Sequence, residues 1–544
     1  MAKRRAIEIE SEVDSSSSSE YSPPSTARQP ISRKRRKHRA QEAATRVGRD
    51  EVDISREYCT AHAASVHQIQ SAASTCRALL QWYTGVSESR GMPWRKPYDP
   101  SLSKDARAQR AYEVWISEIM LQQTQVATVI PYYNRWMEKF PTIRDLAAAS
   151  IDEVNSLWKG LGYYSRASRL LSGAQKTVKD FNGRLPDNAK DMEAHIPGIG
   201  RYSAGAICSI AYGEVVPVLD GNVHRLLSRF LALHAQPKAK ATLNILWSAA
   251  NDIVCGVKAP REEVIKAVAK EELATGARSA ENPALGYPGD VNQALIELGS
   301  TICKVRDPNC EECPLRDQCA GYQWSSASKS GSGDIPDIEE LCTICEPLER
   351  GSGVLAFPMK VERKKAREEL DLVNVIEWRS KSQQRMFLLV KRPENGLLAG
   401  LHEFPTLANV TTSISNSTST ESLLSMYLSS KVNSRVDAGS ADSESYHIVN
   451  TKPVGDVVHV FSHIKKTYRV QWVLLEGCSE PPFPTPLIND DKSTKTPSRR
   501  AKQPRSESTQ RSSGTAWFEM NEVTEANIGT GVRKVWELTK KLWE

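Results

Sequence analysis

The sequence has no long apolar stretch: nowhere do apolar residues continue for the about eighteen positions that mark a membrane-spanning helix. The N-terminus also lacks the apolar core of a secretory signal, and the acidic residues between Met1 and Asp14 argue against a mitochondrial presequence. Neither sign of charge is scarce, since 72 basic residues stand against 65 acidic ones, and a net charge of +7 favours polyanionic partners only weakly. We therefore predict a soluble intracellular protein with no membrane partner.

Eleven cysteines are present, but a disulfide framework is excluded for an intracellular chain because that compartment is reducing. Their spacing must instead reflect metal binding or packing. The run 33–37 is entirely basic and is typical of a nuclear import signal or a nucleic-acid-binding arm. A merely solvated run of charge is the alternative. We predict a nuclear protein, and a mitochondrial form stays open.

A chain of 544 residues is too long for one ordinary hydrophobic core, so several domains are expected. The N-terminal residues include too few apolar side chains to offset the entropy lost on ordering. Helical spacing of apolar residues follows, then a serine-rich linker, then short segments rich in β-branched and aromatic residues. The predicted parts are a disordered basic tail (1–55), an all-α domain (69–322) with an insertion (258–281), a linker (323–352), and an α+β domain (353–544) with a disordered insertion (481–514).

Local signals place some of the elements. Ser150 and Glu153 have the spacing of a capping box at the start of a helix, and Gly160 is placed to end that helix. A further helix is expected over 291–301, just before the cysteine-rich segment 303–319. Strands are predicted over 354–357, 372–378, 386–390 and 468–475.

Four cysteines are closely spaced after that helix, in the pattern Cys-x6-Cys-x2-Cys-x5-Cys: Cys303, Cys310, Cys313 and Cys319. Four converging thiolates suit an iron–sulfur cluster, whereas zinc sites more often pair two CxxC clips across a longer loop. Packing alone gives no reason for so dense a group. A zinc knuckle with four cysteine ligands is the competing interpretation.

Pro197–Gly200 predicts a tight turn between two helices, the second over 202–211. Gly198 and Gly200 permit a turn whose amides point outward at a helix N-terminus, where they can cradle a phosphate. Asp220 follows at the start of another helix. A turn of this kind occurs in many helical hairpins, so alone it indicates little.

A second carboxylate, Glu118, lies in the apolar segment 115–125, where an ionised carboxylate is costly unless it is paired. A raised pKa and use as a general acid are therefore reasonable, and a helix-surface glutamate is the alternative. The segments 115–125, 160–166 and 220–223 closely resemble the adenine DNA glycosylase family, part of the endonuclease III superfamily of helix-hairpin-helix DNA glycosylases. The resemblance extends from about Leu80 to Cys319.

The resemblance implies a chemistry for these residues. Glu118 would protonate N7 of adenine, and Asp220 would stabilise the cationic sugar, with or without a covalent intermediate. Tyr202 and Asn222 match the positions that orient those two groups. Bifunctional relatives carry a lysine where this chain has Tyr202, and without that amine the reaction should stop at hydrolysis of the glycosidic bond.

The resemblance also implies contacts to double-stranded DNA, in which the target adenine must first leave the base stack. Gln123, Thr124, Leu161 and Tyr163 match residues at or beside those that wedge into the duplex. Core packing is the alternative, above all for Leu161. Phosphate contacts are expected from Gly198 and Gly200.

Two metal centres follow from the same family. The loop 303–319 would hold a [4Fe-4S] cluster and present Lys304, Arg306 and Arg316 to phosphate. In the linker, Cys342 and Cys345 form a lone CxxC, and animal members of the family bind zinc there with an additional N-terminal histidine. His67 or His62 could supply that histidine, and a fourth ligand is missing from the sequence pattern.

The C-terminal region resembles a Nudix-type domain over 392–405, but residue 406 is threonine and no magnesium-binding Nudix box follows. We therefore predict a binding module and not a hydrolase. The segment 457–463 resembles the family's loop that recognises 8-oxoguanine, and an ordinary turn is the alternative. The residues expected to recognise that base are Phe461, Ser462 and His463.

The predicted function is removal of adenine opposite 8-oxoguanine or guanine by a monomeric, monofunctional glycosylase. A bifunctional glycosylase and lyase acting on oxidised pyrimidines is the first rival, and Tyr202 opposes it. A DNA-binding protein without activity is the second, and the retention of both Glu118 and Asp220 opposes that. The linker is also expected to dock other repair and replication factors.

Overall fold

The computed structural model describes residues 58–59, 62–257, 286–326, 339–349, 352–361, 365–393, 398–410, 424–428, 432–433, 446–461, 463–484 and 514–543. The predicted tail (1–55) and the insertion 258–281 lie outside the described residues, as does the insertion 481–514 between Pro484 and Gly514. Within the described ranges, no helix is long and apolar enough to cross a membrane.

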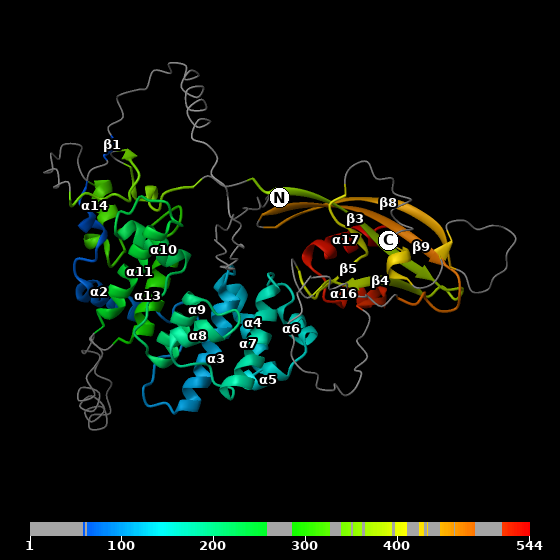
Figure 1. The fold of residues 1–544 in the computed structure, drawn as a ribbon, viewed down its shortest axis with the longest axis horizontal. Helices are drawn as coiled ribbons and strands as arrows, with labels where there is room; N and C mark the ends of the chain where they lie inside the picture. Colours follow the sequence, from blue (N-terminus) through cyan, green and yellow to red (C-terminus); the bar gives the residue numbers. More distant parts are fainter. Residues whose placement is uncertain are drawn as a thin grey trace, which may run out of the picture. The chain divides into compact units, whose positions relative to one another are not determined.

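The chain divides into two compact units (Figure 1). The first unit comprises the residues up to Tyr133 together with Arg184–Val361. The second unit comprises Asn134–Gly183 together with the residues from Glu362 onward. The sequence predicted one helical domain over 69–322, whereas the helices between Asn134 and Gly183 count with the second unit.

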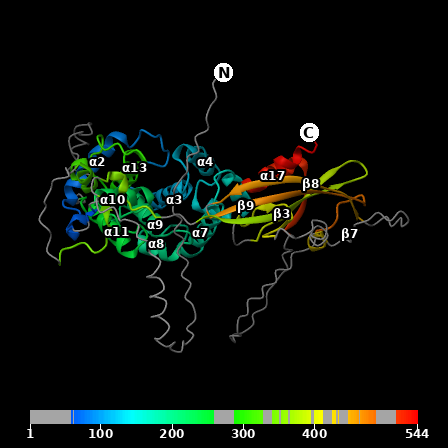
Figure 2. The ribbon, with the colours of Figure 1, turned by 90° about the horizontal axis from the view of Figure 1, so that it is seen from above.

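The first unit is mainly helical (Figure 2). Its long helices are amphipathic, and their apolar faces form a core that includes Leu79, Trp115, Leu246 and Leu295. Its described helices and strands are β1 (Tyr58–Cys59), η1 (Ala64–His67), α2 (Ala72–Val86), α3 (Lys104–Leu121), α8 (Ala189–His195), α9 (Arg201–Ile207), η2 (Cys208–Tyr212), α10 (Gly221–Phe230), α11 (Lys240–Cys255), α13 (Pro288–Thr301), η3 (Arg316–Gln318), α14 (Ala320–Ser326), β2 (Leu348–Glu349) and η4 (Val354–Ala356), and α4 (Val126–Lys139) runs on into the second unit.

The helix predicted over 202–211 is in fact two pieces. The α-helix α9 ends at Ile207, and η2 continues as a turn of π-helix. Asn292, fully buried on α13, donates hydrogen bonds to Ser209 Oγ and Val216 O, both at 2.9 Å. It also accepts one from Val218 N at 3.2 Å. This one amide therefore fixes the extended segment that leads from the π turn towards Asp220.

Three helices precede the sheet in the second unit, namely α5 (Ile143–Ala148), α6 (Ile151–Trp158) and α7 (Ser165–Phe181). The predicted capping box is confirmed, because Ser150 Oγ accepts from Glu153 N while the Glu153 carboxylate accepts from Ser150 N. Thr142 and Asp145 form a second capping box at the start of α5. These caps satisfy amides that a helix start would otherwise leave unpaired.

The sheet of the second unit has the order β10-β4-β3-β9-β8-β7. Its strands are β3 (Arg367–Arg379), β4 (Arg385–Lys391), β5 (His402–Glu403), β6 (Thr406–Leu407), β7 (Val432–Asn433), β8 (Tyr446–Val460), β9 (Ile464–Glu476) and β10 (Thr515–Glu519). β5 and β6 are short and pair with β4 and β3, β3 and β9 are parallel, and β8 and β9 form a long antiparallel hairpin.

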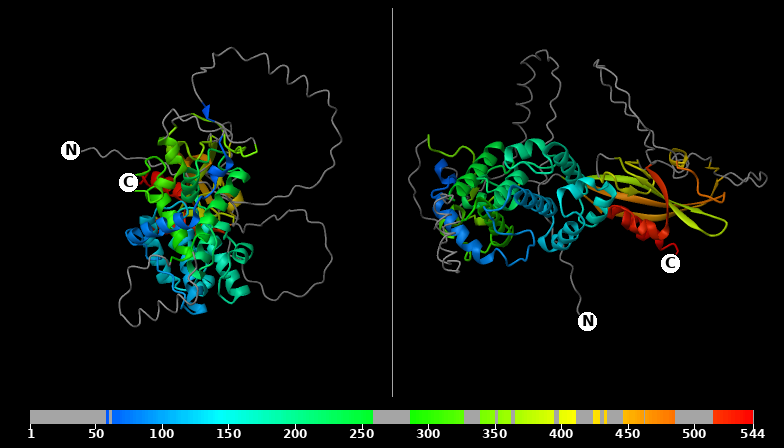
Figure 3. Two further views of the ribbon diagram at one scale, coloured as in Figure 1. Left: turned by 90° about the vertical axis from the view of Figure 1, so that its left-hand side faces the viewer. Right: turned by 90° about the horizontal axis from the view of Figure 1, so that it is seen from below.

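Helices α16 (Met520–Glu525) and α17 (Thr530–Lys540) lie on one face of this sheet (Figure 3). Trp536 of α17 is fully buried and packs edge-on against Phe387, with ring centroids 4.8 Å apart. A second, smaller cluster of buried side chains on this sheet includes Trp378. The predicted fold class, a helical domain followed by an α+β sheet domain, is confirmed.

One predicted strand is wrong. Val354–Phe357 was expected to begin the C-terminal sheet, but Val354–Ala356 is a 3-10 turn in the first unit. Its side chains and backbone have partners there, because Val354 lines a cavity among the cysteines and Phe357 O accepts from Arg229 Nε at 3.0 Å. These tertiary contacts outweigh the β propensity of the valine and the phenylalanine.

Candidate active site

Two carboxylates lie in the first unit, and each accepts a hydrogen bond from a polar side chain. Glu118, near the end of α3, accepts a hydrogen bond of 2.7 Å from the hydroxyl of Tyr202, in the first turn of α9. Asp220 accepts one of 2.8 Å from Asn222 Nδ2. All four side chains are partly exposed, so a bound base and sugar can reach them.

Asp220 is the N-cap of α10. Its Oδ1 accepts a hydrogen bond of 2.7 Å from Val223 N, and its backbone is extended, as this position requires. The other carboxylate oxygen bonds Asn222. The helix N-terminus favours negative charge, so Asp220 is placed where a carboxylate anion is stabilised.

The two carboxyl groups have different surroundings. Burial raises the pKa of Glu118 to about 7, opposed by the hydrogen bond from Tyr202 and assisted by the charge of Asp220. Burial also raises the pKa of Asp220, but three hydrogen bonds to its charged form and the nearby Arg225 work against that rise. Glu118 can therefore carry a proton near neutral pH, while the hydrogen bonds and Arg225 favour the charged form of Asp220. An acid beside an anion is the pairing that acid-assisted cleavage of a glycosidic bond needs.

The predicted hairpin turn is present. Gly198 has φ +82°, a left-handed conformation that favours glycine, and Gly200 is the extended N-cap of α9. Both glycines are exposed. The next residue, Arg201, stacks its guanidinium 3.8 Å from the ring centroid of Trp247 on α11, which holds the start of α9 in place.

Two predicted wedge residues share an unusual backbone. Gln123, after α3, has φ +55°, and Tyr163, before α7, has φ +48°. Strained conformations of this kind collect at functional sites. Tyr163 is 50% exposed, whereas Leu161 is only 7% exposed and packs in the core. Thr124 is half-buried and donates from Oγ1 to Gln122 O at 3.2 Å.

Arg166 shapes the loop that bears Tyr163. It is not among the site residues predicted from the sequence. Its Nη2 donates to Leu161 O at 3.3 Å and to Gly162 O at 3.2 Å. Its guanidinium lies 5.1 Å from the ring of Trp158 and 5.6 Å from that of Tyr163. The hint in the sequence was an arginine in the first turn of a helix directly after a glycine-rich loop.

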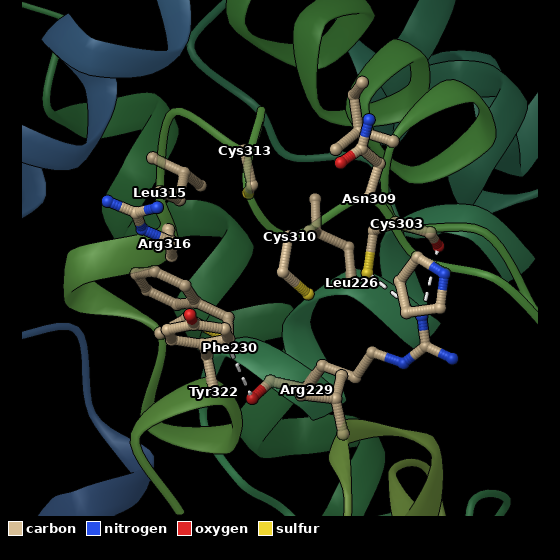
Figure 4. Close-up of a pocket in the computed structure, with 14 residues that line it drawn as sticks. Leu226, Arg229, Phe230, Cys303, Asn309, Cys310, Cys313, Leu315, Arg316 and Tyr322 are labelled. Atoms are coloured by element: carbon tan, nitrogen blue, oxygen red, sulfur yellow. Dashed lines mark hydrogen bonds between the residues drawn. The ribbon is translucent and has the colours of Figure 1, made fainter. Parts of the chain in front are cut away.

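The four clustered cysteines line one cavity (Figure 4). In the close-up, Cys303 and Cys310 direct their sulfur atoms towards its interior. Arg229, which is 2% exposed, donates to Cys303 Sγ at 3.2 Å and to Lys304 O at 2.7 Å. A buried cation beside a sulfur atom suits ligands that carry negative charge. The other described residues at this cavity are mostly apolar, including Leu226, Phe230, Leu315 and Tyr322.

A second group that can hold a metal ion joins the two ends of the first unit. The ligand atoms of His62, His67, Cys342 and Cys345 all lie within 4.8 Å of one another. His67 Nδ1 contacts Leu231 O at 2.8 Å, which leaves its Nε2 facing Cys345 Sγ at 3.3 Å. The expectation that a fourth ligand is missing was wrong, because both histidines take part and not one of them.

The turn between β8 and β9 carries the residues predicted to recognise 8-oxoguanine. Phe461 N donates to Ile464 O at 2.7 Å, and its ring lies 4.5 Å from that of His459 at a near-perpendicular angle. His463 is exposed. Ser462 lies outside the described residues.

The helical hairpin followed by a capping aspartate, the partly exposed Glu118 with its raised pKa and the cysteine cavity are together typical of a helix-hairpin-helix DNA glycosylase, and a Nudix-like sheet domain follows it. The model of the HhH-GPD superfamily base excision DNA repair proteins matches residues 116–252, and that of the NUDIX domain matches residues 378–538. A thermostable thymine-DNA glycosylase of known structure is 23% identical, with a TM-score of 0.34, and the match covers 46% of this chain and 94% of that one.

Relatives in animals are closer. The adenine DNA glycosylase of Rattus norvegicus is 40% identical over 74% of this chain and 70% of its own length. That of Homo sapiens is also 40% identical, over 74% of this chain and 67% of its own length. The chain therefore belongs to the adenine DNA glycosylase family, the MutY type, and is a DNA-binding N-glycosylase of base excision repair.

Proposed function

We propose that the protein hydrolyses the N-glycosidic bond of adenine placed opposite 8-oxoguanine or guanine in double-stranded DNA, and that it leaves the backbone intact. The observation that carries this proposal is the pairing of Glu118 with Tyr202 beside the Asp220 and Asn222 pair. The first pair supplies a proton donor and the second a fixed anion, in one partly exposed site.

The chemical step uses these groups in turn. Glu118, with its pKa raised to about 7, holds a proton that it gives to N7 of the adenine, which turns a poor leaving group into a better one. The bond between sugar and base then breaks, and Asp220 stabilises the cationic sugar, directly or as a covalent intermediate. Water then adds to the sugar carbon, and Glu118, ionised once it has protonated the base, takes the proton that this water loses. Asn222 keeps the Asp220 carboxylate oriented.

The absence of strand cleavage follows from Tyr202. A lyase step needs an amine that forms a Schiff base with the sugar, and this position holds a phenol that bonds Glu118. Burial raises the pKa of Tyr202 well above its ordinary value, so the phenol stays neutral and donates a hydrogen bond to Glu118. We propose that Tyr202 orients Glu118 and takes no covalent part.

Among the predicted wedge residues, we assign DNA contact to Gln123, Thr124 and Tyr163. The left-handed backbone at Gln123 and Tyr163 and the exposure of Tyr163 support this. Because Leu161 is buried, we assign it to packing beneath the loop. Phosphate contacts are assigned to Gly198 and Gly200 of the hairpin turn and to the exposed Lys304 and Arg306, with Arg316 beside them.

Recognition of 8-oxoguanine is assigned to the turn between β8 and β9. Phe461 and His463 flank Ser462 there, and the sequence of this turn resembles the family's recognition loop. The Phe461 ring braced against His459 supports a preformed turn. The rest of the C-terminal domain serves as its scaffold, over the proposed limits 353–544.

The four clustered cysteines fit a [4Fe-4S] cluster. They surround a single cavity with mostly apolar walls, and the guanidinium of Arg229 offsets negative charge on the sulfurs. When bound, such a cluster would link four points of the 303–319 loop to one another and so fix the shape of this loop. We assign the contact between this loop and DNA phosphates to Lys304, Arg306 and Arg316.

The two histidines and two cysteines fit zinc, for which tetrahedral nitrogen and sulfur ligands are typical. Purified protein should therefore contain one zinc besides four iron atoms per chain, measured by mass spectrometry of the metals. Cys345→Ser should lose the zinc, keep the iron and unfold at a lower temperature. A chain with two zinc ions and no iron would favour the zinc-knuckle interpretation, and Cys255→Ser, an exposed cysteine, is the control.

The rate of excision should depend on pH in a bell-shaped manner. Glu118 acts while protonated, so the single-turnover rate should fall about tenfold per pH unit above its pKa of about 7. Asp220 acts while ionised, and its raised pKa should make the rate fall again in acid. In Tyr202→Phe the loss of the hydrogen bond that favours the charged form should move the alkaline limb upward. A rate independent of pH between 6 and about 9 would contradict the acid role.

The decisive experiment is single-turnover cleavage of a duplex with adenine opposite 8-oxoguanine, with and without alkali. We expect strand breaks only after alkali, since alkali cleaves the abasic product. Breaks without alkali would indicate an intrinsic lyase. No breaks from protein loaded with its metals would refute the proposed substrate.

We further propose that the protein acts in the nucleus as a monomer. The basic run 33–37 supports import, although it lies outside the described residues. The proposed domain limits are 69–322 for the helical glycosylase domain and 323–352 for the linker, which we propose as a docking segment for repair and replication factors.

A further inference from the structure

The loop that bears Tyr163 belongs to the same compact unit as the C-terminal domain. Asn134–Gly183 forms the second unit together with the residues from Glu362 onward, while Glu118 and Asp220 lie in the first. The residue proposed to wedge into DNA and the turn proposed to recognise 8-oxoguanine are therefore carried by one body. The contacts within that body decide how firmly the two are coupled.

Lys159, the C-cap of α6, makes the first of these contacts. Its Nζ donates to Thr524 O and to Glu525 O, both at 3.1 Å, at the C-terminus of α16. The last carbonyls of a helix have no partner within the helix and carry partial negative charge, so an ammonium group there is stabilised. Burial lowers the pKa of Lys159, as expected for an amine held against the protein.

Asp152, in the first turn of α6, makes the second set of contacts with the C-terminal domain. Its two carboxylate oxygens both lie 3.1 Å from Lys391 Nζ, the last residue of β4. Its backbone oxygen accepts a hydrogen bond of 3.2 Å from Asn527 Nδ2. The helix α6 is thus attached to the C-terminal domain at its beginning and at its end.

These attachments reach both proposed recognition elements. On one side, Trp158 Nε1 donates to Gly162 O at 2.9 Å, so the end of α6 fixes the loop that bears Tyr163. On the other side, Asn527 is followed by Ile528, which is buried in the core that also contains Tyr468 of β9. β9 begins directly after the recognition turn.

We propose that Lys159 and Asp152 are positioning residues for mismatch discrimination: through α6 they hold the Tyr163 wedge at a fixed place relative to the 8-oxoguanine recognition turn. The two elements then engage one lesion together, and loosening the attachment weakens the preference for 8-oxoguanine without touching the chemistry. This inference rests on the proposed roles of Tyr163 and of the turn.

The test compares single-turnover rates for adenine opposite 8-oxoguanine and opposite guanine in the full-length protein with its metals. Lys159→Met should lower the ratio of the two rates about fivefold or more, mainly through the 8-oxoguanine duplex. Lys179→Met, an exposed lysine on α7, is the matched control and should leave the ratio unchanged. Asp152→Lys and Lys391→Asp should each lower the ratio, and the double charge swap should restore it.

The swap separates positioning from damage to the fold, because a misfolded chain would not be rescued by a second substitution. An unchanged ratio in Lys159→Met, or failure of the swap to restore the ratio, would overturn the inference. If the unmodified protein itself shows no preference for 8-oxoguanine, the proposed recognition role of the turn between β8 and β9 fails, and this inference fails with it, while excision of adenine opposite either base would still support the proposed reaction.

Discussion

Glu118→Gln should reduce the single-turnover rate of adenine excision by roughly 10²–10⁴-fold, the contribution that a positioned general acid makes. Glutamine has nearly the same shape and can still accept the hydrogen bond from Tyr202, so the site should keep its geometry. What it lacks is a proton that can be transferred to the leaving base. The rate should be measured on the duplex with adenine opposite 8-oxoguanine, with alkali added to reveal the abasic product.

Asp220→Asn is the companion variant, and it should lose activity to a similar extent because the cationic sugar then has no anion beside it. Glu88→Gln changes an exposed glutamate outside the site and should retain full activity. All three proteins should bind the same duplex with comparable affinity. Full activity in Glu118→Gln would remove Glu118 from the mechanism.

Gly299→Ala should cost activity although it lies in a helix and carries no charge. A Cβ at this position on α13 would lie 2.7 Å from Asn222 O and 2.9 Å from Asn222 C, closer than real contacts allow. Helix α10 must then shift, and the Asp220 carboxylate at its N-cap shifts with it. Since displacement of a catalytic group by about 1 Å can cost about a hundredfold, we expect a loss approaching that size.

Gly85→Ala is the matched control. It makes the same change within helix α2, where a Cβ would meet nothing within 4 Å. There the substitution should raise helix stability by about 1 kcal/mol and leave excision unchanged. Overpacking at Gly299 should instead destabilise the fold by about 1–3 kcal/mol, measured by thermal unfolding. Equal behaviour of the two variants would show that α13 and α10 are not closely packed in solution.

The sequence was sufficient for features that depend on local spacing. The capping box of Ser150 and Glu153, the cysteine group and the sheet strands around Val373 and Phe387 all follow from short patterns of residue type. Such patterns work because a helix start, a metal site or a buried strand imposes its own periodicity. The family resemblance added the roles, which spacing alone does not give.

Other features depend on contacts between distant segments, and the sequence could not reveal them. The metal group is such a case: the sequence offered His62 and His67 as alternatives, whereas both lie beside cysteines that follow far along the chain. The hydrogen bonds from Arg166 to the loop that bears Tyr163 are another case, and so is the 3-10 turn at Val354, which depends on tertiary contacts. A propensity read from neighbours in the chain holds no information on them.

The group of two histidines and two cysteines also has a topological meaning. His67 and Cys345 are 278 positions apart, and next to them Ala63 pairs with Leu341 and β1 pairs with β2. An ion bound there would close a ring of the chain from His67 to Cys345, which contains the described helices from α2 to α14. Closing so large a ring lowers the conformational entropy of the unfolded chain and hardly changes that of the folded chain. Such an ion would therefore stabilise the fold by raising the free energy of the unfolded state.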